Sequence, residues 1–133
     1  MKLSTEDRLE ILDLYARYSW AFDERQAAEW ASLFVEDGSF VIVGGPRVDG
    51  RAGLEAFADK MANRYPGIRH LVTAITVDAD GDGARGRAYV VAVVPDGTGG
   101  FRNLEQGSYE DRFVSRPEGW RFRNRTFTAW LTP

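Results

Sequence analysis

Apolar residues near the start of the chain recur at the spacing of one helical face, at intervals of four, three and four positions. They are Ile11, Tyr15, Tyr18 and Phe22. Ser4 and Asp7 form a capping-box pattern just before them, so we predict a helix over residues 5–23. Shorter patterns predict helices over residues 27–34 and 51–65, with a strand over residues 39–43 between them.

The second half of the chain changes to the apolar–polar alternation that is typical of strands. Strands are predicted over residues 69–78, 84–94, 102–115 and 120–131. Turn signals at residues 80–83 and 117–119 join neighbouring strands as hairpins. Alternation in the first of these strands puts His70 and Val72 on one face of the sheet. It puts Leu71, Ile75 and Val77 on the other face.

This order of elements predicts the α+β class. We expect a curved, mostly antiparallel sheet, a cone-like α+β barrel, with three N-terminal helices packed on its concave side. A pocket for a small, largely apolar ligand is expected between the helices and the sheet. A chain of 133 residues, 44% of them hydrophobic, is enough to form one domain over residues 1–133.

The residue inventory excludes several kinds of chemistry. The chain has no Cys and one His, which excludes disulfides, cysteine nucleophiles and metal sites built from thiolates or from several His of one chain. We therefore expect no metal and no cofactor. The net charge of −3 predicts neither nucleic acid nor a membrane surface as a partner. The charged start of the chain lacks an apolar signal segment, so a cytoplasmic location is expected.

Seven stretches spread along nearly the whole chain carry a family resemblance. They are residues 14–18, residues 21–23, Trp30, residues 33–40, residues 69–70, residues 107–113 and residues 119–122. Together they resemble the nuclear-transport-factor-2-like superfamily, and within it the SnoaL-like branch. The resemblance implies the fold described above. It implies no single function, because the superfamily hosts isomerases, dehydratases, cyclases, hydrolases and non-catalytic subunits.

Within that branch, the chain is most similar to scytalone dehydratase, hexachlorocyclohexane dehydrochlorinase and bile-acid dehydratase. These enzymes pair an Asp at the end of the first helix with a His at the start of a strand, and Asp23 and His70 match that dyad by position. Tyr18 matches a Tyr of the bile-acid enzyme, and Arg125 matches an Arg of the dehydrochlorinase. The Lys of the dehydrochlorinase has no counterpart near Tyr18, which argues against halide elimination.

The four matched residues fit elimination chemistry on physical grounds. A neutral imidazole such as His70 removes a proton near neutral pH, because its ordinary pKa lies nearby. A carboxylate such as Asp23 on the other ring nitrogen fixes the tautomer and stabilises the imidazolium. Tyr18 would hydrogen-bond the leaving hydroxyl or an enolate oxygen, and Arg125 would stabilise developing negative charge.

The orientation of Arg125 is open in the sequence. Simple alternation in the last strand places Arg125 with Arg121, on the face opposite Phe122. A β-bulge near Asn124 would return Arg125 to the pocket side, and without one Asn124 takes that place. Pocket lining and plain core packing are both open for a further set of residues expected to contact the ligand. They are Tyr15, Trp30, Phe40, Phe57, Met61, Val72, Tyr109 and Phe127.

Three functions are compatible with this pattern. The first is a cofactor-independent lyase that uses an Asp–His dyad for dehydratase-type elimination on a small, largely apolar, ring-containing substrate. The second is an enzyme like the polyketide cyclases or ketosteroid isomerases, with Asp23 as the base. The third is a non-catalytic ligand binder, or a structural subunit like the small subunit of ring-hydroxylating dioxygenases. In each case the apolar outer sheet face predicts a homo-oligomer, and the resemblance favours a trimer over a dimer.

Overall fold

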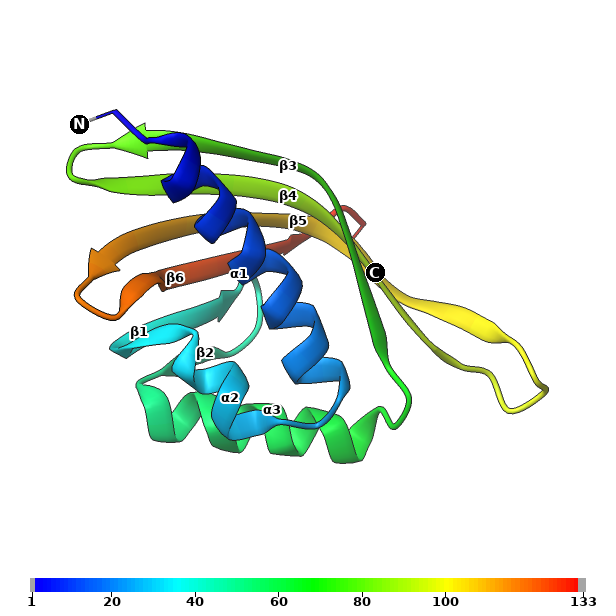
Figure 1. Ribbon diagram of the computed structural model, residues 1–133. Helices are drawn as coiled ribbons and strands as arrows, with labels where there is room; N and C mark the ends of the chain where they lie inside the picture. The colour runs from blue at the N-terminus through cyan, green and yellow to red at the C-terminus, as the bar shows by residue number, and fades with distance from the viewer. Residues whose placement is uncertain (1, 132–133) are drawn as a thin grey trace.

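The computed structural model describes residues 2–131, which form one curved sheet with three helices beneath it (Figure 1). The helices are α1 (Thr5–Asp23), α2 (Ala27–Ser32) and α3 (Arg51–Arg64), and the strands are β1 (Phe34–Ile42), β2 (Arg47–Asp49), β3 (Arg69–Asp80), β4 (Gly83–Pro95), β5 (Phe101–Arg116) and β6 (Gly119–Ala129). Three elements depart from the prediction, and one of them is β1, which begins at Phe34 and not at residue 39. Helix α2 stops at Ser32 because Phe34 already begins β1, and the short β2 has no counterpart among the predicted strands.

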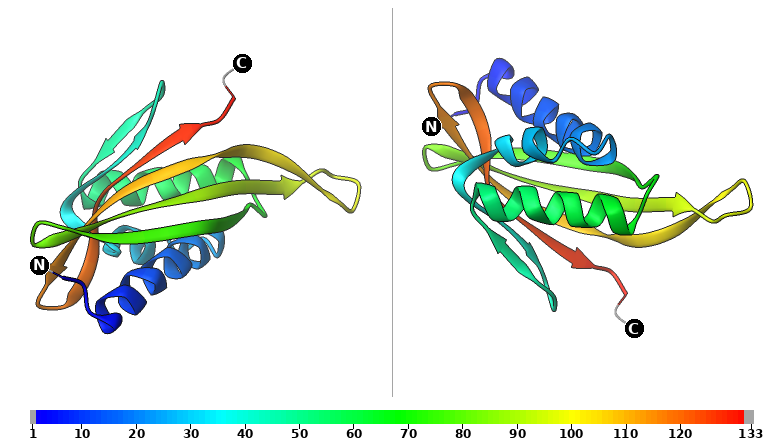
Figure 2. Two further views of the ribbon diagram at one scale, coloured as in Figure 1. Left: turned by 90° about the horizontal axis from the view of Figure 1, so that it is seen from above. Right: turned by 90° about the horizontal axis from the view of Figure 1, so that it is seen from below.

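The strand order across the sheet is β2-β1-β6-β5-β4-β3. Neighbouring strands are antiparallel except for β1 and β6, which run parallel. All three helices lie on the concave side of the sheet (Figure 2). The α+β prediction with a curved, mostly antiparallel sheet is confirmed. Within the described chain β2 and β3 are the edge strands, so the cone stays open and does not close into a barrel.

Helix α1 begins at the capping box that the sequence predicts. The Ser4 hydroxyl accepts a hydrogen bond from the Asp7 backbone N–H at 3.0 Å, and the Asp7 carboxylate accepts one from the Ser4 N–H at 3.1 Å. Its apolar face, including Ile11, Tyr15 and Tyr18, is almost completely buried. The helix therefore packs lengthwise into the concave side of the sheet, and its last turn reaches the start of β3.

The end of α1 is fixed by a left-handed residue, Arg25, with φ of 62°. The N–H groups of Arg25 and Gln26 return to carbonyls of the last helical turn at 3.2 and 2.8 Å, as in a Schellman motif. The Arg25 guanidinium donates to the Ala62 carbonyl at 3.1 Å and to the Asn63 side chain at 2.8 Å, both on α3. These bonds hold the last residue of α1, Asp23, in a defined place.

A β-bulge in β3 changes which residues face the core. Thr73 pairs with Tyr89 and Thr76 with Arg87, so β3 holds one residue more than β4 between these pairs, and Ala74 has φ of 55°. Beyond the bulge, Val77 is 8% exposed and belongs to the core. The prediction that Ile75 and Val77 face outward is therefore wrong, because the extra residue resets the alternation.

A second bulge lies in β6. Phe122 pairs with Phe113 of β5 and Asn124 with Arg112, which leaves Arg123 as an extra residue. Phe122 and Arg125 consequently both face the concave side, and Arg125 is completely buried. Of the two orientations that the sequence leaves open, the structure has the one that requires a bulge.

The core between the helices and the sheet is rich in aromatic contacts. The Trp30 ring lies 5.3 Å from Tyr18 and 5.2 Å from Phe34, and Phe34 lies 5.2 Å from Phe122. Contacts of this kind contribute about 0.5–1.5 kcal/mol each beyond the burial of their area. Among residues 2–131, no helix combines the length and the apolarity needed to cross a lipid bilayer.

Candidate active site

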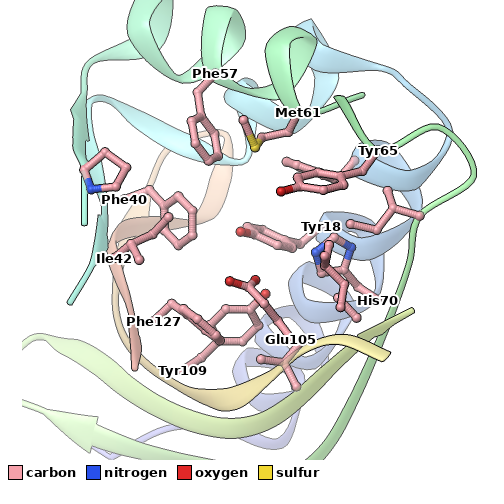
Figure 3. A pocket seen from close by; sticks show the side chains of 16 residues that line it. Tyr18, Phe40, Ile42, Phe57, Met61, Tyr65, His70, Glu105, Tyr109 and Phe127 are labelled. Atoms are coloured by element: carbon pink, nitrogen blue, oxygen red, sulfur yellow. The ribbon is translucent and has the colours of Figure 1, made fainter. Parts of the chain in front are cut away.

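A cavity of about 480 Å³ opens between the sheet, the end of α1 and α3 (Figure 3). Its walls are mostly aromatic and aliphatic, with a few polar groups among them, which is typical of a small-molecule site. The residues that line it are Tyr18, Phe22, Phe40, Ile42, Pro46, Phe57, Met61, Tyr65, Ile68, His70, Val90, Ala92, Leu104, Glu105, Tyr109 and Phe127. The expected pocket between helices and sheet is thus present.

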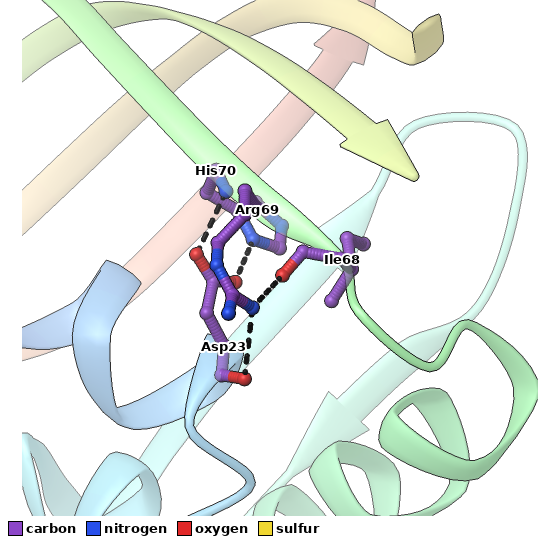
Figure 4. Close-up of polar contacts among 4 residues, drawn as sticks. All are labelled: Asp23, Ile68, Arg69 and His70. Atoms are coloured by element: carbon purple, nitrogen blue, oxygen red, sulfur yellow. Dashed lines mark hydrogen bonds and ion pairs between the residues drawn. The ribbon is translucent and has the colours of Figure 1, made fainter. Parts of the chain in front are cut away.

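Asp23 and His70 are in direct contact at the edge of this cavity (Figure 4). The Nδ1 atom of His70 lies 2.7 Å from Oδ1 of Asp23, and the backbone N–H of His70 donates to Oδ2 at 2.8 Å. Both carboxylate oxygens are therefore used to hold one residue. The side chains are 12% exposed for His70 and 6% for Asp23, so water competes little for the contact.

This geometry indicates which ring nitrogen of His70 carries the proton. An ionised Asp23 accepts the proton of Nδ1, which leaves Nε2 of a neutral His70 as the unprotonated nitrogen. The ring of Phe22 meets the imidazole edge-on with 5.1 Å between centroids, which restricts its rotation. His70 lines the cavity and Asp23 does not. The pair is thus arranged as a base that faces the cavity, with a carboxylate behind it.

Tyr18 and Tyr109 also point into the cavity (Figure 3). Burial raises the pKa of both hydroxyls, while the charge of Arg125 acts in the opposite direction on each. Both hydroxyls consequently stay protonated near neutral pH. They can donate a hydrogen bond to an oxygen of a bound molecule.

Arg125 lies behind these tyrosines and does not line the cavity. It binds Asp111 through two bonds, from Nε at 2.7 Å and from Nη2 at 2.9 Å, and both side chains are completely buried. Tyr15 donates to the same carboxylate at 2.6 Å. The guanidinium carbon lies 4.2 Å from the centroid of Tyr18 and 3.6 Å from that of Tyr109. Arg125 therefore packs against the two rings as a cation–π partner, and it does not reach a molecule bound in the cavity.

Four residues predicted to contact a ligand lie elsewhere. Tyr15 is turned toward Asp111, and Trp30 is completely buried among other rings. Val72 packs against the core without lining the cavity. Asn124 is carried by the bulge to a polar groove on the convex face, where Thr126 also lies. The structure does bring together the other predicted wall residues, namely Phe40, Phe57, Met61, Tyr109 and Phe127.

The cavity also contains residues that the sequence-based prediction missed. Tyr65 and Ile68 flank the turn that leads into His70, so their proximity to the dyad was a readable signal. Glu105 is a charged residue in the wall, and it lies four positions before Tyr109 on the same face of β5, so alternation along the strand was a readable signal for it as well. The other missed residues are Phe22, Ile42, Pro46, Val90, Ala92 and Leu104. Among residues 2–131, no three His, Asp or Glu side chains gather in a metal-binding arrangement.

Comparison with known proteins identifies the family of this fold. Residues 4–126 match a family model described as a SnoaL-like domain. The chain belongs to the SnoaL-like family. An uncharacterized protein from Mycobacterium tuberculosis is 33% identical over 128 residues, which cover 92% of this chain and 84% of the relative.

Solved structures support the same assignment. An NTF2-like protein with a cystatin-like fold from Novosphingobium aromaticivorans is 30% identical, with a TM-score of 0.90, over 96% of this chain and 84% of its own. The protein Aln2 from a Streptomyces species is 25% identical, with a TM-score of 0.87, over 97% of this chain and 94% of its own. SnoaL-like proteins include polyketide cyclases and hydroxylase subunits, and NTF2-like domains bind small hydrophobic ligands. Membership of this family is thus compatible with a small hydrophobic ligand and leaves several reactions open.

Proposed function

We propose that this SnoaL-like protein is a cofactor-independent lyase that eliminates water from a small, largely apolar, ring-containing substrate. The contact of 2.7 Å between Asp23 and His70 at the wall of an aromatic cavity is the observation that carries the proposal. The cavity volume of about 480 Å³ lies in the lower half of the range for small-molecule sites. The apolar walls favour largely apolar ring compounds over extended polar molecules.

The reaction follows from the positions of the polar groups. Nε2 of His70 takes a proton from the carbon next to the one that bears the hydroxyl, and the electron pair of that C–H bond forms the C=C bond. The C–O bond breaks, and the leaving oxygen takes up a proton from solvent and departs as water. Asp23 stabilises the imidazolium, and the Tyr18 hydroxyl donates to the oxygen on which negative charge develops. The proton on His70 returns to solvent after the product leaves.

The same geometry argues against Asp23 as the base of a cyclase-like or isomerase-like reaction. Both oxygens of Asp23 bind His70, and the carboxylate is not part of the cavity wall. A substrate in the cavity would meet His70 first. The arrangement therefore supports His70 as the proton acceptor and Asp23 as the group that orients it.

The test uses a panel of ring β-hydroxy ketones, whose dehydration to a conjugated enone is followed by ultraviolet absorption. For a compound that the wild type dehydrates, we expect His70→Ala to lower kcat by roughly 10²–10⁴-fold, the usual contribution of a general base. Asp13→Asn serves as the control for Asp23→Asn, because Asp13 is an exposed carboxylate on the same helix. Asp23→Asn should lower kcat, and Asp13→Asn should not.

The alternatives give different results in the same assay. Loss of activity in Asp23→Asn with His70→Ala within about tenfold of the wild type would assign the base role to Asp23 and refute the His base. Binding of the panel compounds by the wild type without turnover would indicate a non-catalytic binder or structural subunit.

We also propose that the protein forms a homo-oligomer, and of the two states considered we favour the trimer. Leu71 is 54% exposed and Tyr89 49% exposed on the outer face of β3 and β4. The Trp130 ring, 50% exposed, stands 5.3 Å from Tyr89 and extends the same apolar patch. Contiguous exposed apolar area of this kind usually marks a contact surface.

A further inference from the structure

The cavity contains one charged group to which the proposed reaction gives no role, the carboxylate of Glu105 on β5 (Figure 3). Regular alternation back from Tyr109 through Gly107 places Glu105 on the cavity face of β5, and the ladder between β4 and β5 becomes irregular only beyond it. Ala92 pairs with Glu105 and Val93 pairs with Asn103, so Leu104 is an extra residue. The ladder to β6 begins only at Gly107, so Glu105 lies beyond the paired end of that strand.

Glu105 and His70 stand in one row across three strands. Ala92 of β4 is the pairing partner of His70 on one side and of Glu105 on the other. Paired residues on one face project in the same direction, and two strand spacings separate the outer members by roughly 10 Å between backbones. The residue between them has only a methyl side chain, which leaves the space above it open. A ring that sits over Ala92 would have the base at one end and the carboxylate at the other.

The cavity wall contains an acidic side chain without a Lys or Arg to balance it. Glu105 is the single carboxylate among the lining residues, and none of the lining residues that the structure describes is Lys or Arg. Within residues 2–131, no hydrogen bond or ion pair engages the Glu105 carboxylate. Partial burial raises the pKa of Glu105, against which the charge of a protonated His70 acts. A bound molecule with a hydrogen-bond donor would lower the free-energy cost of an ionised Glu105 in the cavity, and a bound anion would increase this cost.

We propose that Glu105 is a specificity-determining residue, which selects ring compounds with a hydroxyl or ammonium donor at the end far from the reacting carbon and rejects carboxylates and phosphates. The inference rests on the proposed function for the position of the reacting carbon at His70. It narrows the substrate class from apolar ring compounds to neutral or cationic ones.

Three naphthalene probes of similar size test this selectivity by titration calorimetry at about pH 8, where carboxylates are ionised and alkylamines are protonated. They are 2-naphthol, 2-naphthylmethylamine and 2-naphthoate. We expect the wild type to bind the hydroxyl and ammonium probes at least tenfold more tightly than 2-naphthoate. Glu105→Gln should weaken the ammonium probe and strengthen 2-naphthoate, so that the difference shrinks to about threefold or less.

Glu110→Gln is the matched control, because Glu110 lies five positions along the same strand and borders the polar groove of the convex face. It removes the same charge from the protein and should leave the ranking of the probes unchanged. Equal affinity for the three probes, binding of none of them, or an unchanged ranking in Glu105→Gln would overturn the proposal. His70→Ala separates it from the proposed function, because this variant should lose turnover and keep the ranking.

Discussion

Replacing Arg125 by Met removes one partner of a completely buried ion pair while keeping most of the side-chain volume. Arg125 and Asp111 are both inaccessible to solvent and are joined by two hydrogen bonds of 2.7 and 2.9 Å. Such a change leaves the Asp111 charge with Tyr15 as its remaining partner, at 2.6 Å. Breaking a buried pair on one side costs about 3–5 kcal/mol, a large part of the roughly 5–15 kcal/mol that stabilises a typical domain.

Urea unfolding followed by tryptophan fluorescence measures this cost. With an m-value of about 1–3 kcal/mol/M, the midpoint should fall by about 1 M or more. Arg123→Met is the control, because Arg123 lies two positions away and pairs with Asp37 at the surface, where an ion pair contributes at most about 1 kcal/mol. Adding Asp111→Leu to Arg125→Met should restore part of the loss, because the unpaired charge is then gone. If Arg125→Met costs no more than Arg123→Met, the described role of the pair is wrong.

Three further predictions concern the tyrosine, the cavity carboxylate and the outer face. Tyr18→Phe should lower kcat by roughly tenfold to a hundredfold in the dehydration assay with little effect on unfolding, because it removes one donor to the developing charge and keeps the ring. The pKa of Glu105 is raised in the folded state, so ionisation of this carboxyl at neutral pH destabilises the fold. Glu105→Gln should therefore raise the Tm at neutral pH. The gain should vanish below about pH 4, where Glu105 is protonated in the folded and the unfolded state. An unchanged Tm difference between these two pH values would contradict that reasoning. Tyr89→Glu should convert the proposed trimer to monomer in light scattering, and a mass equal to the wild type's would exclude this patch as the contact.

Much of the fold was readable from periodicity, because α1 and the long hairpin strands obey regular spacing over many residues. The capping box at Ser4 and the turn signals of the hairpins fixed their ends. The short β2 carries only three residues and therefore shows no periodicity. The parallel pairing of β1 with β6 joins distant parts of the chain, and local patterns do not encode it.

The residues of the candidate site could be predicted from the sequence only in part. The dyad rests on two residues at element ends, Asp23 and His70, and the family resemblance placed both. Pocket lining by other residues depends on which face each strand residue takes. Single extra residues at Ala74, Arg123 and Leu104 reverse that assignment locally. A bulge is defined by the pairing between two strands, so alternation along one strand cannot reveal it.

The extra residue at Arg123 has a consequence for how such a chain can change over generations. It sets the phase of the rest of β6, so that Arg125 and Phe127 point inward. A substitution in this strand alters one contact, whereas a single-residue deletion would turn both side chains outward at once. The strand can therefore diverge by point replacement, while a length change of one residue is tolerated only with a compensating change nearby.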